Sequence, residues 1–267
     1  MDLLLPGFDQ ELYYTEPQEF ISDISFVGHL SNPWSSQEDN RIIFSSSDRL
    51  ITFEQARKHL EQKIETEDIA GYIEEDYINL ALSFIPKNIR EQISLSPTVK
   101  YDLACRTLRM TSRHKMLSMA CANGVSRRFF GTSGWNNWSQ YKPYYQGMLT
   151  DPAKLRKVYQ TSRINLHDGA GSGVGLHFRT MDCMASGGLL FYLESVEDSR
   201  PGGMHSVFTP GKHYVSVNKA NFANKVKFYL NHANEHKEMC VAANKEVMQN
   251  HQWKFRIQKI VEDLQKL

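Results

Sequence analysis

The sequence lacks the features that mark three large classes of protein. It has four cysteines among 267 residues, and no two of them form a C-x-x-C pair. Scattered cysteines argue against a disulfide framework and favour a reduced chain, so we expect a cytoplasmic protein. No stretch approaches the roughly 18 apolar residues of a membrane span. The first residues are also too few and too acidic for a signal peptide.

An excess of charge is absent as well. Thirty-one basic and 30 acidic residues give a net charge of +1, which indicates no nucleic-acid partner. Internal repeats and low-complexity tracts are missing too. Because 41% of the residues are hydrophobic, the chain can form one good core, or one large and one small core.

One run of the chain is the most informative. Residues 162–193 predict, in order, a strand, a glycine-rich loop, a short helix, a Gly-Gly stop and a second strand. This order is typical of a βαβ unit whose loop lies at the carboxyl end of a parallel strand. Open α/β sheets bind ligands there, often phosphates on the helix N-terminus. We therefore expect an α/β fold with a Rossmann-like parallel sheet flanked by helices.

The rest of the chain divides into three regions. Residues 1–31 lead into the domain and contain a first strand, from Asp23 to Gly28. Residues 32–123 are mainly helical: a Ser-rich loop over 32–47 precedes a capping box at Thr52 and Gln55, which opens helices that continue to residue 122. Residues 124–267 return to an α/β pattern. The run from Val125 to Gly131 predicts a strand that ends in glycine, and residues 132–148 predict an aromatic loop. Asp151-Pro152 predicts the start of a helix, and a further helix is expected from Asn218 to Leu230. We expect this last region to bind a nucleotide-sugar and the helical region to be an insertion.

The glycine-rich loop is the first candidate binding site. Glycine lets a backbone approach a ligand closely, and the loop matches neither a P-loop nor a G-x-G-x-x-G fingerprint. We favour a phosphate-binding loop over a flexible surface loop, because a strand and a helix flank it in the required order. Its glycines alternate with small residues: Gly169, Gly171, Gly173 and Gly175.

Three side chains near the following helix are further candidates. His177 and Arg179 lie at its start, where a cation opposes the helix dipole unless an anion binds. Arg179 alternatively pairs with a nearby surface acid. Asp182 lies one turn later and suits a ribose hydroxyl, although a plain surface acid is the alternative.

Other groups carry weaker hypotheses. The i, i+4, i+8 series His232, His236 and Cys240 has zinc spacing, but a solvated helix face is favoured. The aromatic residues between Trp135 and Tyr145 either stack on a base or pack on the sheet. Five arginines are expected on solvated faces or in ion pairs, with a minor chance that one reaches a ligand: Arg106, Arg109, Arg113, Arg127 and Arg128.

The run from Asn165 to Leu193 resembles the donor-binding region of GT-B glycosyltransferases, specifically the group-1, spore-maturation-like branch. That branch has a helix of the form R-x-F/M-E-x-x-A-x-G-G, which here is Arg179-Thr-Met-Asp-Cys-Met-Ala-Ser-Gly-Gly188. Ile24-Ser-Phe-Val-Gly28 is similar to the SFVG strand of the family. Residues 130–147, 214–230 and 251–256 resemble its later segments.

The resemblance implies the C-terminal, donor-binding half of a GT-B fold with a helical insertion. It implies a nucleotide-sugar substrate, no metal and no separate cofactor. Arg179 and His177 are then the catalytic residues, and the donor-binding residues are Gly28, Gly171, Gly173, Gly175, Arg179 and Asp182.

Two departures from the family pattern matter. The retaining relatives have two glutamates eight positions apart, which correspond here to Val174 and Asp182, and valine cannot contact the donor sugar. The chain also begins where the acceptor-binding domain of the family should end. We therefore expect a fragment, or a partner chain that supplies the acceptor side.

The expected function is transfer of a sugar from a nucleotide-sugar to an unknown acceptor. The alternative is a non-catalytic module, derived from the same fold, that binds a nucleotide-sugar or another protein. A sugar-nucleotide epimerase is a third hypothesis.

Overall fold

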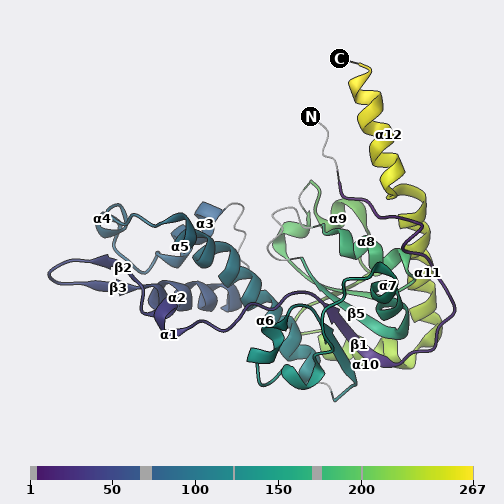
Figure 1. Cartoon of the computed structure of the whole chain (residues 1–267), viewed down its shortest axis with the longest axis horizontal. Coiled ribbons are helices and arrows are strands. Elements are labelled where there is room, and N and C mark those ends of the chain that lie inside the picture. The colour runs from purple at the N-terminus through teal and green to yellow at the C-terminus, as the bar shows by residue number, and fades with distance from the viewer. Residues whose placement is uncertain (1–4, 67–73, 123, 170–175, 200, 267) are drawn as a thin grey trace.

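The centre of the protein is a five-stranded parallel sheet with the strand order β4-β1-β5-β6-β7 (Figure 1). The computed structural model describes residues 5–66, 74–122, 124–169, 176–199 and 201–266. All neighbouring strands are parallel, so their carboxyl ends share one edge. The strands are β1 (Ser22–Val27), β4 (Arg127–Phe130), β5 (Ser162–Asp168), β6 (Leu190–Leu193) and β7 (Val215–Val217).

The chain reverses direction across the sheet between β1 and β5. From β1 it passes outward to β4 on one side, and then returns to place β5 on the other side of β1. Such a topological switch point leaves a crevice outside the carboxyl ends of the two strands, where open α/β sheets bind ligands. The fold therefore predicts the location of a site before any side chain is considered.

Helices cover both faces of the sheet. Alternate side chains along a strand point to opposite faces, so Phe191 and Leu193 join one core and Leu190 and Tyr192 the other. The first core includes residues of α6 and α10, the second includes residues of α7, α8 and α9, and α11 contributes to both. These helices are α6 (Thr107–Cys121), α7 (Pro152–Thr161), α8 (Phe178–Ala185), α9 (Met204–Val207), α10 (Phe222–Asn231) and α11 (Ala233–Asn250).

The turn after α8 explains the Gly-Gly pair. Gly187 has φ of +79°, a left-handed conformation that suits a helix C-terminus. At Gly188 an added Cβ would lie 2.8 Å from Asn165 Nδ2 and 3.0 Å from the Tyr159 carbonyl oxygen, so no larger residue fits. The two glycines thus end the helix and let β6 begin against β5.

The helical insertion has a core of its own. Its buried apolar residues, from Ile51 to Ala104, form a cluster separate from the two sheet cores. In Figure 1 the insertion extends to one side of the sheet. Its elements are α1 (Ser36–Asp39), the hairpin β2 (Ile42–Ser45) and β3 (Leu50–Thr52), α2 (Phe53–Thr66), α3 (Glu74–Ala81), α4 (Lys87–Arg90), α5 (Pro97–Tyr101) and a π-helical turn over Asp102–Arg106.

Contacts of Arg106 hold together the two chain segments that connect the insertion to the sheet. Arg106, at the end of the π-helical turn, donates to Glu38 Oε1 at 2.6 Å and to the carbonyl oxygen of Asn32 at 3.1 Å. Its guanidinium also lies 3.8 Å from the ring centroid of Trp34. Because these partners come from the incoming chain and Arg106 from the outgoing one, the insertion is held against the start of α6.

Three expectations from the sequence need correction. The predicted loop over 32–47 contains α1 and β2, because Ser35 caps a short helix and β2 pairs with β3. The aromatic loop after β4 contains 3-10 turns over Ser133–Asn137 and Lys142–Tyr144. The helix expected from residue 218 begins at Phe222 instead. The capping box is confirmed, since Thr52 and Gln55 exchange both hydrogen bonds.

The chain ends in α12 (Trp253–Leu264), which projects away from the sheet (Figure 1). A further 3-10 turn covers Val196–Ser199. None of the helices in the described ranges has both the length and the apolar character needed to cross a membrane.

We predict that Asn165→Leu destabilises the sheet by about 2–3 kcal/mol. Asn165 is buried in β5; its Oδ1 accepts from Ser25 at 2.7 Å, and its Nδ2 donates to the Tyr159 carbonyl oxygen at 3.1 Å. Leucine leaves these buried groups without partners. Asn231→Leu, at the exposed end of α10, is the matched control. Urea unfolding that gives equal losses for both variants contradicts this account.

Candidate functional site

The candidate site lies at the switch point, where β1 and β5 end. Val27, Gly28 and His29 follow one another at the end of β1, and Asp168 and Gly169 close β5. The register pairs Phe26 with Leu166, so the two strands end side by side. Helix α8 begins ten residues after the end of β5, and its first turn lies at the same edge of the sheet, because Arg179 donates to the carbonyl oxygen of Val27.

An ion pair crosses this edge. Arg113 of α6 donates through Nε to Asp168 Oδ2 at 3.0 Å and through Nη1 to the carbonyl oxygen of His29. Asp168 is buried, and its burial raises the pKa of this carboxyl, while the Arg113 guanidinium opposes that rise. The pair therefore links α6 to the ends of both strands and neutralises the acid closest to the crevice.

His29 lies among guanidinium groups. Partial burial lowers the pKa of this imidazole, and the charges of Arg179, Arg113 and Arg109 lower it further. Arg109 lies one turn before Arg113 on α6, hence on the same face of the helix. The switch point is thus surrounded by positive charge from two different helices.

Arg179 has no carboxylate within ion-pair distance in the described part of the chain. Its Nη1 donates to the carbonyl oxygen of Val27 at 3.2 Å, which places the half-buried guanidinium beside the end of β1. The described residues therefore do not show the alternative, in which Arg179 pairs with a nearby surface acid. A cation at a helix N-terminus is unfavourable by about 0.3–1 kcal/mol, so an anion at this position would be stabilised by both partners.

His177 is the N-cap of α8. Its Nδ1 accepts from the Arg179 backbone N–H at 3.1 Å, and its carbonyl oxygen accepts from Thr180 N at 3.0 Å. Burial, reinforced by Arg179 and Arg113, lowers the pKa of His177 to about 4, so the ring is neutral at pH 7. Because Nδ1 accepts, the proton resides on Nε2, which is a donor. Two amides expected to face a ligand are therefore occupied by the cap.

Asp182 is buried within the first turns of α8, with only 3% of its surface exposed. Burial raises its pKa to about 7, and the Arg179 guanidinium opposes the rise. The carboxyl lies close enough to Tyr13 and Tyr159 to influence both phenols. Its assignment to a ribose hydroxyl stays a prediction.

The structure describes only one of the four glycines of the predicted loop. Gly171, Gly173 and Gly175, together with Val174, lie outside the described residues. Gly169 is described, and an added Cβ there would lie 1.7 Å from the Tyr192 hydroxyl, so the Tyr192 side chain packs where any larger residue would have a side chain.

Gly28 uses both of its backbone groups within the protein. Its N–H donates to Phe130 O at 2.9 Å, and its carbonyl accepts from Trp135 Nε1 at 3.1 Å. Gly28 therefore closes the β1–β4 edge, and its predicted contact with a donor stays a prediction.

The weaker candidates have structural partners. His232 and His236 each bond a backbone carbonyl, of Phe228 and Arg163 respectively. The described residues contain no group of three or more potential metal ligands. Trp135 and Tyr141 are buried in the sheet core. Among the five arginines, only Arg109 and Arg113 lie at the switch point: Arg106 holds the insertion, Arg127 bonds the Val125 and Cys121 carbonyls, and Arg128 bonds Ser22 and Ser162.

Two site residues escaped the sequence analysis. His29 carries no motif of its own, although its place directly after the SFVG strand was an available signal. His167 is buried beside His177, with ring centroids 5.5 Å apart, and its Nδ1 has no partner. Its strand position predicted burial, but only the fold brings the two imidazoles together.

A family model and several solved structures are similar to this chain. A family model described as glycosyl transferase-like matches residues 106–262. No curated protein gives a significant match. Sucrose-phosphate synthase from Thermosynechococcus elongatus superposes with a TM-score of 0.53 at 10% identity, over 99% of this chain and 52% of that one. This likeness supports the α/β, Rossmann-like architecture and nothing finer.

Two other solved structures are similar at lower scores. Anabaena HepE in complex with UDP has a TM-score of 0.49 at 12% identity, covering 98% of this chain and 56% of that one. The C-terminal domain of the group 1 glycosyl transferase LpcC from Francisella tularensis has a TM-score of 0.40 at 10% identity, covering 92% and 99%. The chain thus spans about half the length of the synthase and of HepE.

We predict that the free energy of unfolding of the wild type falls as the pH rises. We expect Asp182→Asn to remove this fall. The folded-state pKa of Asp182, about 7, exceeds its ordinary value of 3.8. The folded state therefore binds more protons between these values, and wild-type stability falls as pH rises through this window. Below about pH 4 the variant and the wild type should be similar, and above about pH 7 the variant should be more stable by a few kcal/mol.

The measurement is urea unfolding at pH 4, 6 and 8. Asp48→Asn, in the exposed turn between β2 and β3, is the matched control for the loss of a carboxylate. A difference between Asp182→Asn and the wild type that does not change with pH contradicts the prediction.

Proposed function

The chain belongs to the glycosyl transferase-like family, and from that premise we propose that it binds a nucleotide-sugar and forms the donor side of a glycosyl transfer site. The diphosphate of the donor lies at the switch point between β1 and β5, beside the first turn of α8.

The uncompensated guanidinium of Arg179 carries this proposal. Arg179 lies at the carboxyl edge of a parallel sheet, bonds only a backbone carbonyl among the described residues, and opposes the dipole of its own helix. Asp168 is already paired with Arg113, and the buried Asp182, the acid whose pKa the Arg179 guanidinium does lower, still has a pKa raised to about 7 by burial. The site therefore has spare positive charge and a planar donor suited to a phosphate.

Catalysis at this edge is then mainly electrostatic. Arg179 stabilises the negative charge that develops on the departing diphosphate, an effect that is large where donors are fixed in advance. His177 is neutral and presents its Nε2 proton, so it can donate a hydrogen bond without adding a cation. Its capping bond to the Arg179 amide fixes the ring orientation.

Within the family we propose membership of the spore-maturation-like branch. The support is the run from Arg179 to Gly188, in which four positions of the branch pattern have a physical role in this fold. Arg179 faces the switch point, Ala185 is buried beneath α11, and Gly187 and Gly188 form the turn into β6.

A second candidate is a module that binds a nucleotide-sugar without transferring it. It is favoured by the state of the two acids at this edge: Asp168 is paired and Asp182 is buried, so neither is presented to a sugar hydroxyl. Release of free sugar or transfer to an acceptor distinguishes the two, since only a transferase turns over its donor.

We predict that one nucleoside diphosphate among UDP, GDP, ADP and CDP raises the melting temperature of the full chain by several degrees. A ligand at about 100 times its dissociation constant stabilises by about 2.7 kcal/mol, which is easily detected in a thermal melt. Arg179→Ala should abolish the shift, because it removes the phosphate-binding cation.

Arg49→Ala is the matched control, because it removes the same charge from the exposed turn between β2 and β3. Its shift should equal that of the wild type. If no nucleoside diphosphate raises the melting temperature, or if Arg179→Ala retains the full shift, the proposed site is wrong.

A further inference from the structure

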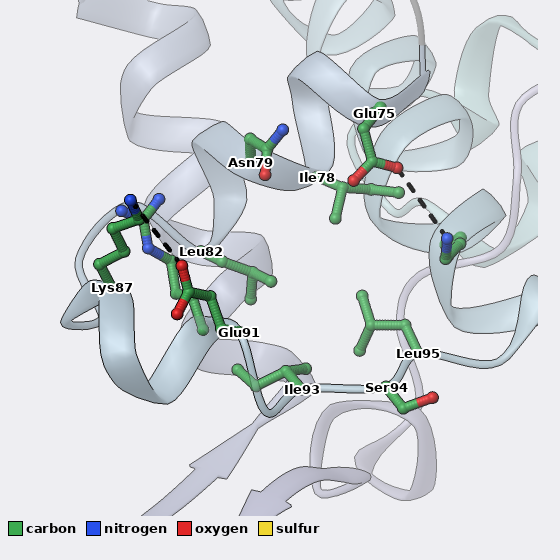
Figure 2. A pocket seen from close by; sticks show the side chains of 11 residues that line it. Glu75, Ile78, Asn79, Leu82, Lys87, Glu91, Ile93, Ser94 and Leu95 are labelled. Atoms are coloured by element: carbon green, nitrogen blue, oxygen red, sulfur yellow. Dashed lines mark ion pairs between the residues drawn. The ribbon is translucent and has the colours of Figure 1, made fainter.

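A cavity lies in the helical insertion, away from the sheet. It has a volume of about 490 Å³ and is framed by α3, α4, α5 and the segment between α4 and α5 (Figure 2). This volume falls within the range of about 300–1,000 Å³ that is usual for small-molecule sites. None of its lining residues belongs to the edge of the sheet.

The inner wall of the cavity is apolar. Ile78 and Leu82 project into it from the α3 side and belong to the core of the insertion. Ile93 and Leu95, from the segment after α4, face them and are half-buried. Ile78 and Leu82 are already buried, so an apolar chain bound between the two walls would mainly remove Ile93 and Leu95 from water, which is favourable.

The rim of the cavity is charged, with cations in excess. Lys87 lies 3.8 Å from Glu91, and Lys100 lies 3.9 Å from Glu75, at exposed positions where such pairs contribute little. Arg90 is the third cation of the rim. It has no ion pair in the described part of the chain, and its Nε is buried without a hydrogen-bond partner.

Because its Nε is enclosed by protein, a ligand in the cavity would bind to the terminal nitrogens of Arg90, which form no ion pair among the described residues. The planar fork of arginine matches the two oxygens of a carboxylate or phosphate, and the apolar walls lie next to it. We therefore propose that this cavity binds a small amphiphile, with its oxyanion head on Arg90 and its apolar chain between α3 and the 93–95 segment. This site is independent of the proposed glycosyl transfer site.

Titration of the full chain with decyl phosphate below its micelle concentration tests the proposal by calorimetry. Decanoate, decanol and inorganic phosphate are the other probes. We expect saturable 1:1 binding of decyl phosphate, decanoate or both, and the comparison identifies the head group. Decanol and inorganic phosphate should each bind at least about 10-fold more weakly, because each lacks one half of the ligand.

Arg90→Gln should weaken binding of the amphiphile by about 10-fold or more, since a hydrogen bond to a charged group contributes about 1.5–3 kcal/mol. Lys58→Gln is the matched control: it removes one exposed positive charge on α2, outside the cavity, and should leave the affinity within about twofold. Circular dichroism melts verify that both variants fold.

Two results overturn the proposal. The first is the absence of saturable binding by either amphiphile. The second is equal affinity in Arg90→Gln, Lys58→Gln and the wild type, which would indicate nonspecific adsorption to apolar surface.

Discussion

The ion pair between Arg113 and Asp168 connects three elements that the chain presents far apart in sequence. Arg113 comes from α6, Asp168 ends β5, and the same guanidinium bonds the carbonyl of His29 just after β1. Removing one partner of such a buried pair costs about 3–5 kcal/mol, because the other charge is left uncompensated. The pair therefore fixes the relative positions of the two strand ends at the switch point, and with them the shape of the crevice that a ligand would occupy.

The same pair determines the charge that remains. With Asp168 neutralised by Arg113, Arg179 and Arg109 keep positive charge without a carboxylate partner among the described residues. Burial lowers the pKa of His29 and lowers the pKa of His177 to about 4, so the His177 ring adds no charge at pH 7. Asp182, whose raised pKa lies near 7, contributes only part of a negative charge. Two free guanidiniums suit a dianion such as a diphosphate. The helix amides are a smaller part of the site, because His177 caps them.

Much of the fold was predictable because its signals are local. Apolar runs ending in glycine predicted β1 and β4, Asp151-Pro152 predicted the start of α7, and Gly187-Gly188 predicted the end of α8. The hairpin of β2 and β3 was not predicted, because both strands are short and the serines next to them are typical of a loop. Among the candidate site residues, Arg179 and His177 were predicted from their place at the start of a helix, whereas His29 and the pairing of Arg113 depend on strand order. Periodicity within a segment contains no information about which strand ends meet.

At the switch point, the proposed role of Arg179 is to bind the terminal phosphate of a nucleoside diphosphate. Calorimetric affinities of the wild type and Arg179→Ala for the nucleoside diphosphate and the matching monophosphate form a double-mutant cycle. We expect a coupling free energy of about 1.5–3 kcal/mol between Arg179 and the terminal phosphate. Arg179→Ala should then weaken binding of the diphosphate about 10- to 150-fold more than binding of the monophosphate. Equal weakening of both ligands would contradict it, because Arg179 would then not contact the terminal phosphate.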